Sequence, residues 1–194
     1  MLMFHCEVSD VHELRLLDLR DDRELFALTD ANRGNLRQWL PWLDSIERVD
    51  DTRRFIATTQ QQFAHEEGFV AAICYGSKSN LSEQRKIVGT IGLNWIDRAN
   101  RIGYIGYWLA PSHRGRGIMS ASCQSLIDYA FSGLNLNRLV IACACENHRS
   151  RAIPERLGFK CEGVARDAEW LYDRFVDHDV YTLLAREWKG QNIE

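Results

Sequence analysis

The stretch from residue 104 to residue 131 constrains the fold of this 194-residue chain more than any other. Residues 104–109 are aromatic and branched, as in a strand, and Pro111 ends that strand because proline cannot donate to a sheet ladder. A basic, glycine-rich turn follows, and then an amphipathic helix pattern made by Leu126, Ile127, Ala130 and Phe131. The first turn of such a helix presents backbone N–H groups that have no intrahelical partner and that favour phosphate. The segment therefore predicts a strand, a phosphate-binding turn and a helix, in that order.

Two common phosphate-binding patterns do not fit this turn. A Walker loop needs Gly-Lys-Ser/Thr at its end, and none follows here. A dinucleotide fingerprint needs a small Gly or Ala where Ser120 stands, and an acidic residue near position 137, which is missing. Gly115 and Gly117 would instead let a pyrophosphate approach the backbone, with Arg114 and Arg116 adding positive charge.

The turn resembles the acetyl-coenzyme A turn of the GNAT acetyltransferases, whose pattern is Arg or Gln, two residues, Gly, one residue and then Gly or Ala. Arg114 and Gly117 match that pattern, and Met119 departs from it at the last position. The run Gly-Ile-Met-Ser that follows is similar to the RimJ/RimL-type protein N-terminal acetyltransferases. The resemblance covers nearly the whole chain and implies acetyl-coenzyme A as cosubstrate, with no metal.

By this resemblance the cosubstrate lies along the turn and reaches the start of a later helix. The cofactor-binding residues so implied are Leu109, Ala110, Arg114, Gly115, Arg116, Gly117, Ile118, Met119, Ser120 and Asn147. Among them Asn147 would bind the pantetheine arm, although it is also a good helix N-cap and could hold both roles. A backbone N–H near Leu109 or Ala110 would stabilise the oxyanion of the reaction.

Two residues are the candidates for catalysis. The resemblance puts Ser150 near the thioester sulfur, and Glu169 matches the glutamate of an Ala-Glu motif that is proposed as the base in the RimL-like branch. Such a base suits an α-amine, whose pKa of about 7.7–8.0 requires only a modest proton acceptor. The structural alternatives are a helix N-cap for Ser150 and a solvated loop carboxylate for Glu169.

One familiar catalytic group is missing. Many GNAT enzymes carry a tyrosine that protonates the departing thiolate, and Pro154 occupies its place in this chain. Ser150 or a water molecule is then left as the proton donor, and the proline predicts a short or distorted helix. We expect His178 and Asp179 to be structural hydrogen-bonding partners in the last hairpin. If the amine attacks the thioester directly, the cysteines need no catalytic role.

Two tryptophans, Trp39 and Trp42, stand on either side of Pro41. RimJ/RimL-like chains have a similar Trp-Leu-Pro-Trp run on the acceptor side of the fold, so the resemblance implies a substrate-binding wall. Ordinary core packing and an exposed patch for a partner are the alternatives.

Composition narrows the class of protein further. The length and a hydrophobic fraction of 45% suit a single domain over residues 1–194. A net charge of −3 argues against a nucleic-acid partner. We find neither an apolar run that could span a membrane nor a signal peptide. The six cysteines lack metal or redox spacing, which predicts free thiols and a cytoplasmic location.

The order of elements predicts an α/β protein with one mixed, twisted sheet of about seven strands and flanking helices. The strands are expected at residues 14–17, 69–75, 87–95, 104–109, 139–145, 159–165 and 175–184, with a polar loop at 76–86. Helices are expected at 21–32, interrupted by Gly34, at 51–67, after the turn, and at 150–157. In the GNAT fold the strands at 104–109 and 139–145 would splay apart to admit the pantetheine arm.

These observations favour an enzyme that moves an acetyl group from acetyl-coenzyme A to a primary amine, by direct attack of the amine. The resemblance favours the N-terminus of a protein, such as a ribosomal protein, and a homodimer. Two other readings stay open: a transferase that detoxifies small amines or antibiotics, and a silent coenzyme A-binding module.

Overall fold

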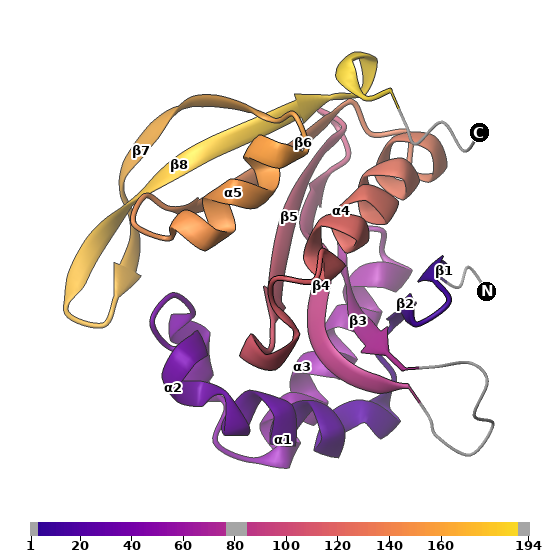
Figure 1. Ribbon diagram of the computed structural model, residues 1–194, viewed down its shortest axis with the longest axis vertical. Helices are drawn as coiled ribbons and strands as arrows, with labels where there is room; N and C mark the ends of the chain where they lie inside the picture. The colour runs from indigo at the N-terminus through magenta and orange to yellow at the C-terminus, as the bar shows by residue number, and fades with distance from the viewer. Residues whose placement is uncertain (1–3, 77–84, 190–194) are drawn as a thin grey trace.

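The chain folds around one mixed sheet of eight strands, seen in a computed structural model that describes residues 4–76 and 85–189 (Figure 1). The strand order is β1-β2-β3-β4-β5-β6-β8-β7. The strands are β1 (His5–Ser9), β2 (His12–Leu16), β3 (Phe69–Tyr75), β4 (Lys86–Asp97), β5 (Ile102–Leu109), β6 (Arg138–Ala144), β7 (Lys160–Leu171) and β8 (Arg174–Leu184). Among these strands β5 and β6 form the one parallel pair.

The helices lie on both faces of the sheet. Three helices gather near one end of β5: α1 (Asp22–Ala31), α2 (Arg33–Leu36) and α3 (Val49–Ala64) (Figure 1). The other two, α4 (Ile118–Asp128) and α5 (His148–Arg156), lie away from that end (Figure 1). A π-helical turn, Tyr129–Gly133, extends α4. No helix of the described residues is long and apolar enough to cross a membrane.

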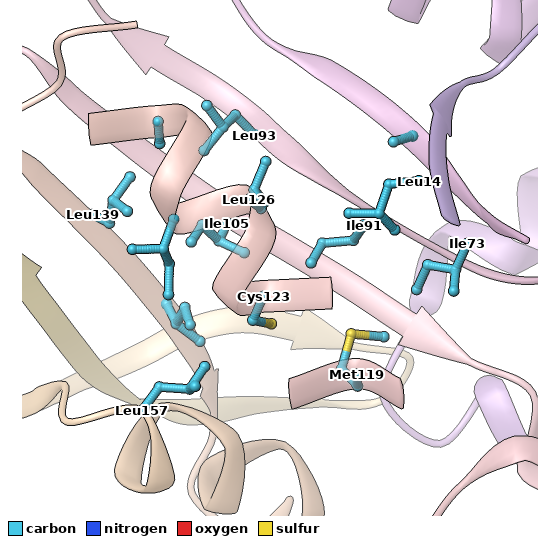
Figure 2. Packing of buried hydrophobic residues seen from close by; sticks show 14 of the residues in the cluster. Leu14, Ile73, Ile91, Leu93, Ile105, Met119, Cys123, Leu126, Leu139 and Leu157 are labelled. Carbon is cyan, nitrogen blue, oxygen red and sulfur yellow. The ribbon is translucent and has the colours of Figure 1, made fainter. Parts of the chain in front are cut away.

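The alternation of side chains along β3 divides the core into two clusters. Ala71 and Ile73 join the larger cluster, which includes Leu126 of α4. Ala72 and Cys74 point the other way and join the smaller cluster, which includes Ile56 of α3. Figure 2 shows the larger cluster, in which α4 packs over the central strands. Because both faces of the central strands are covered, those strands are apolar over most of their length.

The two central strands separate partway along their length. β5 pairs with β6 only from Ile102–Arg138 to Tyr104–Val140. Beyond that point β5 continues against β4 as far as Leu109, and β6 continues against β8 as far as Ala144. The expected splay is therefore present, and the diverging ends leave backbone groups of both strands turned toward a common opening.

Three expectations about the elements need correction. The sheet has an eighth strand, β1, a short strand in which the partly buried Cys6 and Val8 alternate with exposed polar residues. Gly34 does not interrupt the first helix, because it lies inside α2. The break comes at Asn32, whose side chain donates to the Leu28 carbonyl at 2.8 Å and so satisfies the last turn of α1.

The third correction concerns the length of β7, which continues six residues beyond the predicted end at 165. A bulge between Ala165 and Glu169 shifts the register with β8, and Asp167 lies there with φ of +51°. Its N–H bonds to the Asp177 carboxylate at 2.9 Å, which holds the extra residues against β8. Most of the predicted loop at 76–86 lies outside the described residues.

Candidate active site

Two glycines with left-handed backbone shape the turn between β5 and α4. Gly115 and Gly117 each have φ of +75°, which residues with a Cβ adopt only under strain. A Cβ on either glycine would meet no heavy atom within 4 Å, so the backbone is open. Gly117 is the N-cap of α4, and Arg114 braces the turn by donating to the Leu109 carbonyl at 3.1 Å. An open backbone at a helix N-terminus is a geometry that accommodates phosphate.

A cavity of about 1200 Å³ lies between this turn and α5, and we name it the turn cavity. Eight of the ten residues predicted to hold the cofactor line it: Leu109, Arg114, Gly115, Gly117, Ile118, Met119, Ser120 and Asn147. Its size and its glycine backbone fit an extended, phosphorylated cosubstrate such as acetyl-coenzyme A.

The other two predicted residues, Ala110 and Arg116, are not part of that lining. Arg116 is exposed on the turn, and Ala110 is buried with its N–H bonded to the Val88 carbonyl at 2.8 Å. The prediction that Ala110 could supply the oxyanion hydrogen bond is therefore wrong, because its N–H already donates to the Val88 carbonyl of β4. N–H groups alternate along a strand, so that of Leu109 faces the opposite edge of β5, where β6 has separated.

Two more cations line the turn cavity, Arg149 and Arg156. They are seven residues apart on α5 and therefore lie on one face of the helix. Arg156 donates to the Ser120 hydroxyl at 2.8 Å. Burial, followed by the nearby charge of Arg149, lowers the pKa of Arg114. The repulsion between the positive charges of Arg114 and Arg149 would be relieved by a bound anion. The seven-residue spacing was the signal in the sequence that could have identified them.

A second cavity, of about 710 Å³, extends from α3 to the β7–β8 hairpin, and we name it the aromatic cavity. Its lining includes Trp39, Trp42, Phe55, Glu169 and His178. The two cavities share the lining residues Trp39, Leu40, Tyr107, Trp108, Asn147 and Ser150. These shared residues mark the junction at which a ligand in one cavity would meet a ligand in the other.

Ser150 stands at this junction, in the first turn of α5. Asn147 is the N-cap, and its side-chain oxygen accepts the Ser150 N–H at 3.2 Å. The Ser150 hydroxyl donates to the Tyr107 hydroxyl of β5 at 3.3 Å. The N-cap role expected for Asn147 is thus present, and its side chain lines both cavities as well. Tyr107 was missed because nothing in its local sequence distinguishes it from a core aromatic residue.

Glu169 lies on β7 with its carboxylate 3.2 Å from Nε2 of His178 on β8. The Glu169 side chain is 33% exposed, so it is neither a solvated loop carboxylate nor a core residue. His178 is therefore a partner of the candidate base as well as a hairpin residue. Asp179 points elsewhere: it is buried, and one of its oxygens lies 2.9 Å from Nε of the partly exposed Arg151. The sequence did not indicate the Glu169–His178 contact, which depends on the bulge in β7.

Trp39 and Trp42 lie outside both core clusters. Trp42 is 41% exposed and lines only the aromatic cavity, whereas Trp39 lines both cavities. The segment that carries them is tied to the tip of the hairpin. Tyr172 donates to the Arg37 carbonyl at 2.7 Å, and the Arg37 guanidinium lies 4.1 Å from the centre of the Tyr172 ring. This contact holds the aromatic wall and the Glu169 hairpin on either side of one cavity.

The sheet splays beside a glycine turn at a helix N-terminus, and the two cavities meet at the splay. This arrangement is the architecture of an acyl-coenzyme A-dependent transferase. Residues 13–160 match the family model for the acetyltransferase (GNAT) domain. The chain belongs to the GNAT family, and it is an acetyl-coenzyme A-dependent N-acetyltransferase.

Known proteins resemble the chain over most of its length. YdaF of Bacillus subtilis is 38% identical over 97% of this chain and 100% of its own length. The ribosomal-protein-serine acetyltransferase of Escherichia coli is 33% identical over 92% of this chain and 95% of its own. Among solved structures, RimL, a ribosomal L7/L12 α-N-protein acetyltransferase in complex with coenzyme A, is 28% identical with a TM-score of 0.86, covering 93% of this chain and 98% of that one. The similarity therefore places the chain beside the RimL-like branch.

Proposed function

We propose that the enzyme acetylates the N-terminal α-amine of a protein, such as a ribosomal protein. The observation that carries this proposal is the junction of the two cavities at Ser150, with the Glu169–His178 pair lining the aromatic cavity. The similarity to the ribosomal-protein-serine acetyltransferase of Escherichia coli supports the same acceptor class. In this reading the turn cavity holds acetyl-coenzyme A, which supplies the acetyl group, and the aromatic cavity receives the amine.

Glu169 is the base that takes a proton from the incoming amine. An α-amine has a pKa near 7.7–8.0, whereas a lysine side chain has one near 10.4, so about two orders of magnitude more of the α-amine is neutral near pH 7. A carboxylate held by His178 is a modest base, which suits the α-amine better than lysine. Trp39 and Trp42 would enclose the first residues of the acceptor chain.

The remaining roles follow the lining of the turn cavity. The glycine turn, with Arg114 and the α5 arginines, would bind the phosphates, and Asn147 would contact the pantetheine arm. The Leu109 N–H, which faces the splay, would stabilise the charge that develops on the carbonyl oxygen. Ser150 would donate a hydrogen bond to the sulfur as the thiolate departs.

The test is a thiol-release assay with acetyl-coenzyme A and a panel of acceptors. The panel holds peptides that begin with Ser, Thr or Ala, the same peptides with blocked N-termini and one internal lysine, and small amines including aminoglycosides. We expect turnover on the free peptides only, with fragmentation mass spectrometry placing the acetyl group on the α-amine. Turnover confined to small amines would contradict the proposal and favour detoxification. Tight coenzyme A binding without any turnover would favour a silent module.

We also propose that the enzyme is a homodimer. β7 is an edge strand of the sheet, and Val164, Trp170 and Phe175 on the hairpin are more than half exposed. An edge strand with exposed apolar residues favours association. Sedimentation equilibrium of the wild-type chain and of Trp170→Ser should give a dimer for the first and a shift toward monomer for the second. A monomeric wild type would contradict this proposal.

A further inference from the structure

Pro154 leaves one backbone carbonyl of α5 without its helical partner. In an α-helix the carbonyl of residue i accepts the N–H of residue i+4, and for Ser150 that residue is Pro154, which has no N–H. Pro154 lies within the helix, at its seventh position, and α5 nevertheless continues to Arg156. The proline thus frees a hydrogen-bond acceptor at the residue where the two cavities meet.

Tyr107 supplies the missing donor. Its hydroxyl donates to the Ser150 carbonyl at 3.1 Å, and the same hydroxyl oxygen accepts the Ser150 side-chain O–H at 3.3 Å. Tyr107 comes from β5, in the part where β5 and β6 have separated, and it lines both cavities. One phenol group therefore ties the splayed strand to the first turn of α5 by two hydrogen bonds.

We propose that Tyr107 is a positioning residue for acetyl transfer, which acts by holding the carbonyl and the hydroxyl of Ser150 at the junction of the two cavities. The acetyl acceptor in this step is the amine, whose nitrogen bonds to the thioester carbon while the carbon–sulfur bond breaks. The sulfur keeps the electron pair and ends as a thiol with a proton that originates from the amine. Ser150 stabilises the sulfur during that exchange, so its hydroxyl must face the junction.

We do not assign Tyr107 as the acid of this step, because its hydroxyl already donates its one proton to the Ser150 carbonyl. Burial raises the pKa of the phenol, which keeps that donor protonated. The bond from the Ser150 hydroxyl to Tyr107 is long for a hydroxyl pair, so the Ser150 proton can turn to the sulfur while the shorter bond to the carbonyl keeps α5 in place. Proline thus replaces the usual acidic tyrosine on the helix, and a tyrosine on the strand supports the serine instead.

The kinetic test uses Tyr107→Phe, Ser150→Ala and the double variant, each assayed with acetyl-coenzyme A and the best acceptor of the panel above. We expect Tyr107→Phe to lower kcat by about 10- to 100-fold and to leave the KM for acetyl-coenzyme A within twofold. In the Ser150→Ala background the same change should cost less than about threefold, because the residue through which Tyr107 acts is already gone. Tyr104→Phe, on the same strand but outside both linings, is the matched control and should behave like the wild type.

The inference rests on the role proposed for Ser150, and the outcomes separate the two. A normal kcat for Tyr107→Phe beside a slow Ser150→Ala would overturn the role of Tyr107 and leave that of Ser150 standing. A normal kcat for Ser150→Ala would overturn both. Losses that multiply in the double variant would also overturn the inference, because Tyr107 would then act independently of Ser150.

A second measurement isolates the carbonyl. Pro154→Ala restores an N–H that can pair with the Ser150 carbonyl, so the stability of that variant should depend less on the Tyr107 hydroxyl. We expect Tyr107→Phe to lower the thermal midpoint by roughly 2–6 °C in the wild-type background, since it leaves a polar group unpaired. In the Pro154→Ala background the loss should be less than half as large. Equal losses in the two backgrounds would contradict the pairing of Tyr107 with the carbonyl that Pro154 frees.

Discussion

The carboxylate of Glu169 lies 3.2 Å from Nε2 of His178, although the two residues are not direct partners in the hairpin. Glu169 pairs with Val176, and His178 pairs with Ala165. The contact is diagonal and is made possible by the bulge that separates Ala165 from Glu169. It gives the aromatic cavity a carboxylate of fixed orientation, which is the property that a catalytic base needs.

The first prediction follows from that pair. Glu169→Gln keeps the shape of the side chain and removes its proton-accepting oxygen, so kcat should fall by about 10²- to 10³-fold. The KM for acetyl-coenzyme A should stay within twofold, because Glu169 does not line the turn cavity. Steady-state kinetics would measure both. Glu66→Gln, on an exposed residue paired with Arg98, is the control and should leave kcat unchanged. An unchanged kcat for Glu169→Gln would remove this residue as the base.

The second prediction concerns the glycine turn. Gly117→Ala places a Cβ on a residue with φ of +75°, which costs about 1–2 kcal/mol of backbone strain and adds bulk where the pyrophosphate approaches. The Kd for coenzyme A should rise at least about tenfold by isothermal titration calorimetry, beyond any fall in thermal midpoint. Gly34→Ala is the matched control, since its Cβ also meets nothing within 4 Å but its φ is ordinary. Unaltered affinity in Gly117→Ala would contradict the placement of the phosphates.

The third prediction separates the two tryptophans. Trp42 lines only the aromatic cavity, so Trp42→Ala should raise the KM for the acceptor peptide by about 5- to 50-fold and leave the KM for acetyl-coenzyme A unchanged. Trp39 lines both cavities, so Trp39→Ala should raise both KM values. Trp95→Ala, on a half-exposed tryptophan outside both linings, controls for the loss of an aromatic surface residue. Equal effects of Trp39→Ala and Trp42→Ala would argue against the division into two cavities.

The fourth prediction concerns stability against pH. His12 is buried beneath α4 with its Nε2 2.9 Å from the Ser122 hydroxyl, and burial, followed by the charge of Arg85, lowers its pKa. The unfolded chain has the ordinary value of 6.5 and therefore binds the proton first, so this contribution is complete above pH 6.5 and is lost as the pH falls below that value. Urea unfolding of the wild type and of His12→Gln between about pH 7.5 and 5.5 measures the difference. We expect a shallower loss in His12→Gln, and parallel curves would contradict the assignment to His12.

Much of the site could be predicted because it is contiguous in the chain. Seven of the eight predicted cofactor residues that line the turn cavity fall within residues 109–120, since a turn and the helix start after it bring their residues together without help from the rest of the fold. The eighth, Asn147, is the N-cap of α5 and reaches the cavity only through the packing of that helix. The pairing of Ala110 could not be foreseen, because an N–H becomes unavailable only when a neighbouring strand chooses its register. Tyr107 and Ser150 are 43 positions apart, and no local pattern connects them.

The sequence by itself determined the strand, the glycine turn and the helix that follows it. Glycine φ, proline stops and helical periodicity are properties of a few adjacent residues. The same local rules gave Asn147 and Ser150 as candidate N-caps, of which the structure uses Asn147. The tertiary structure alone decided that the Tyr107 hydroxyl contacts Ser150 and that His178 contacts Glu169. Those contacts depend on where β5 leaves β6 and on a bulge that changes the register of β7, and both are set by the packing of the whole sheet.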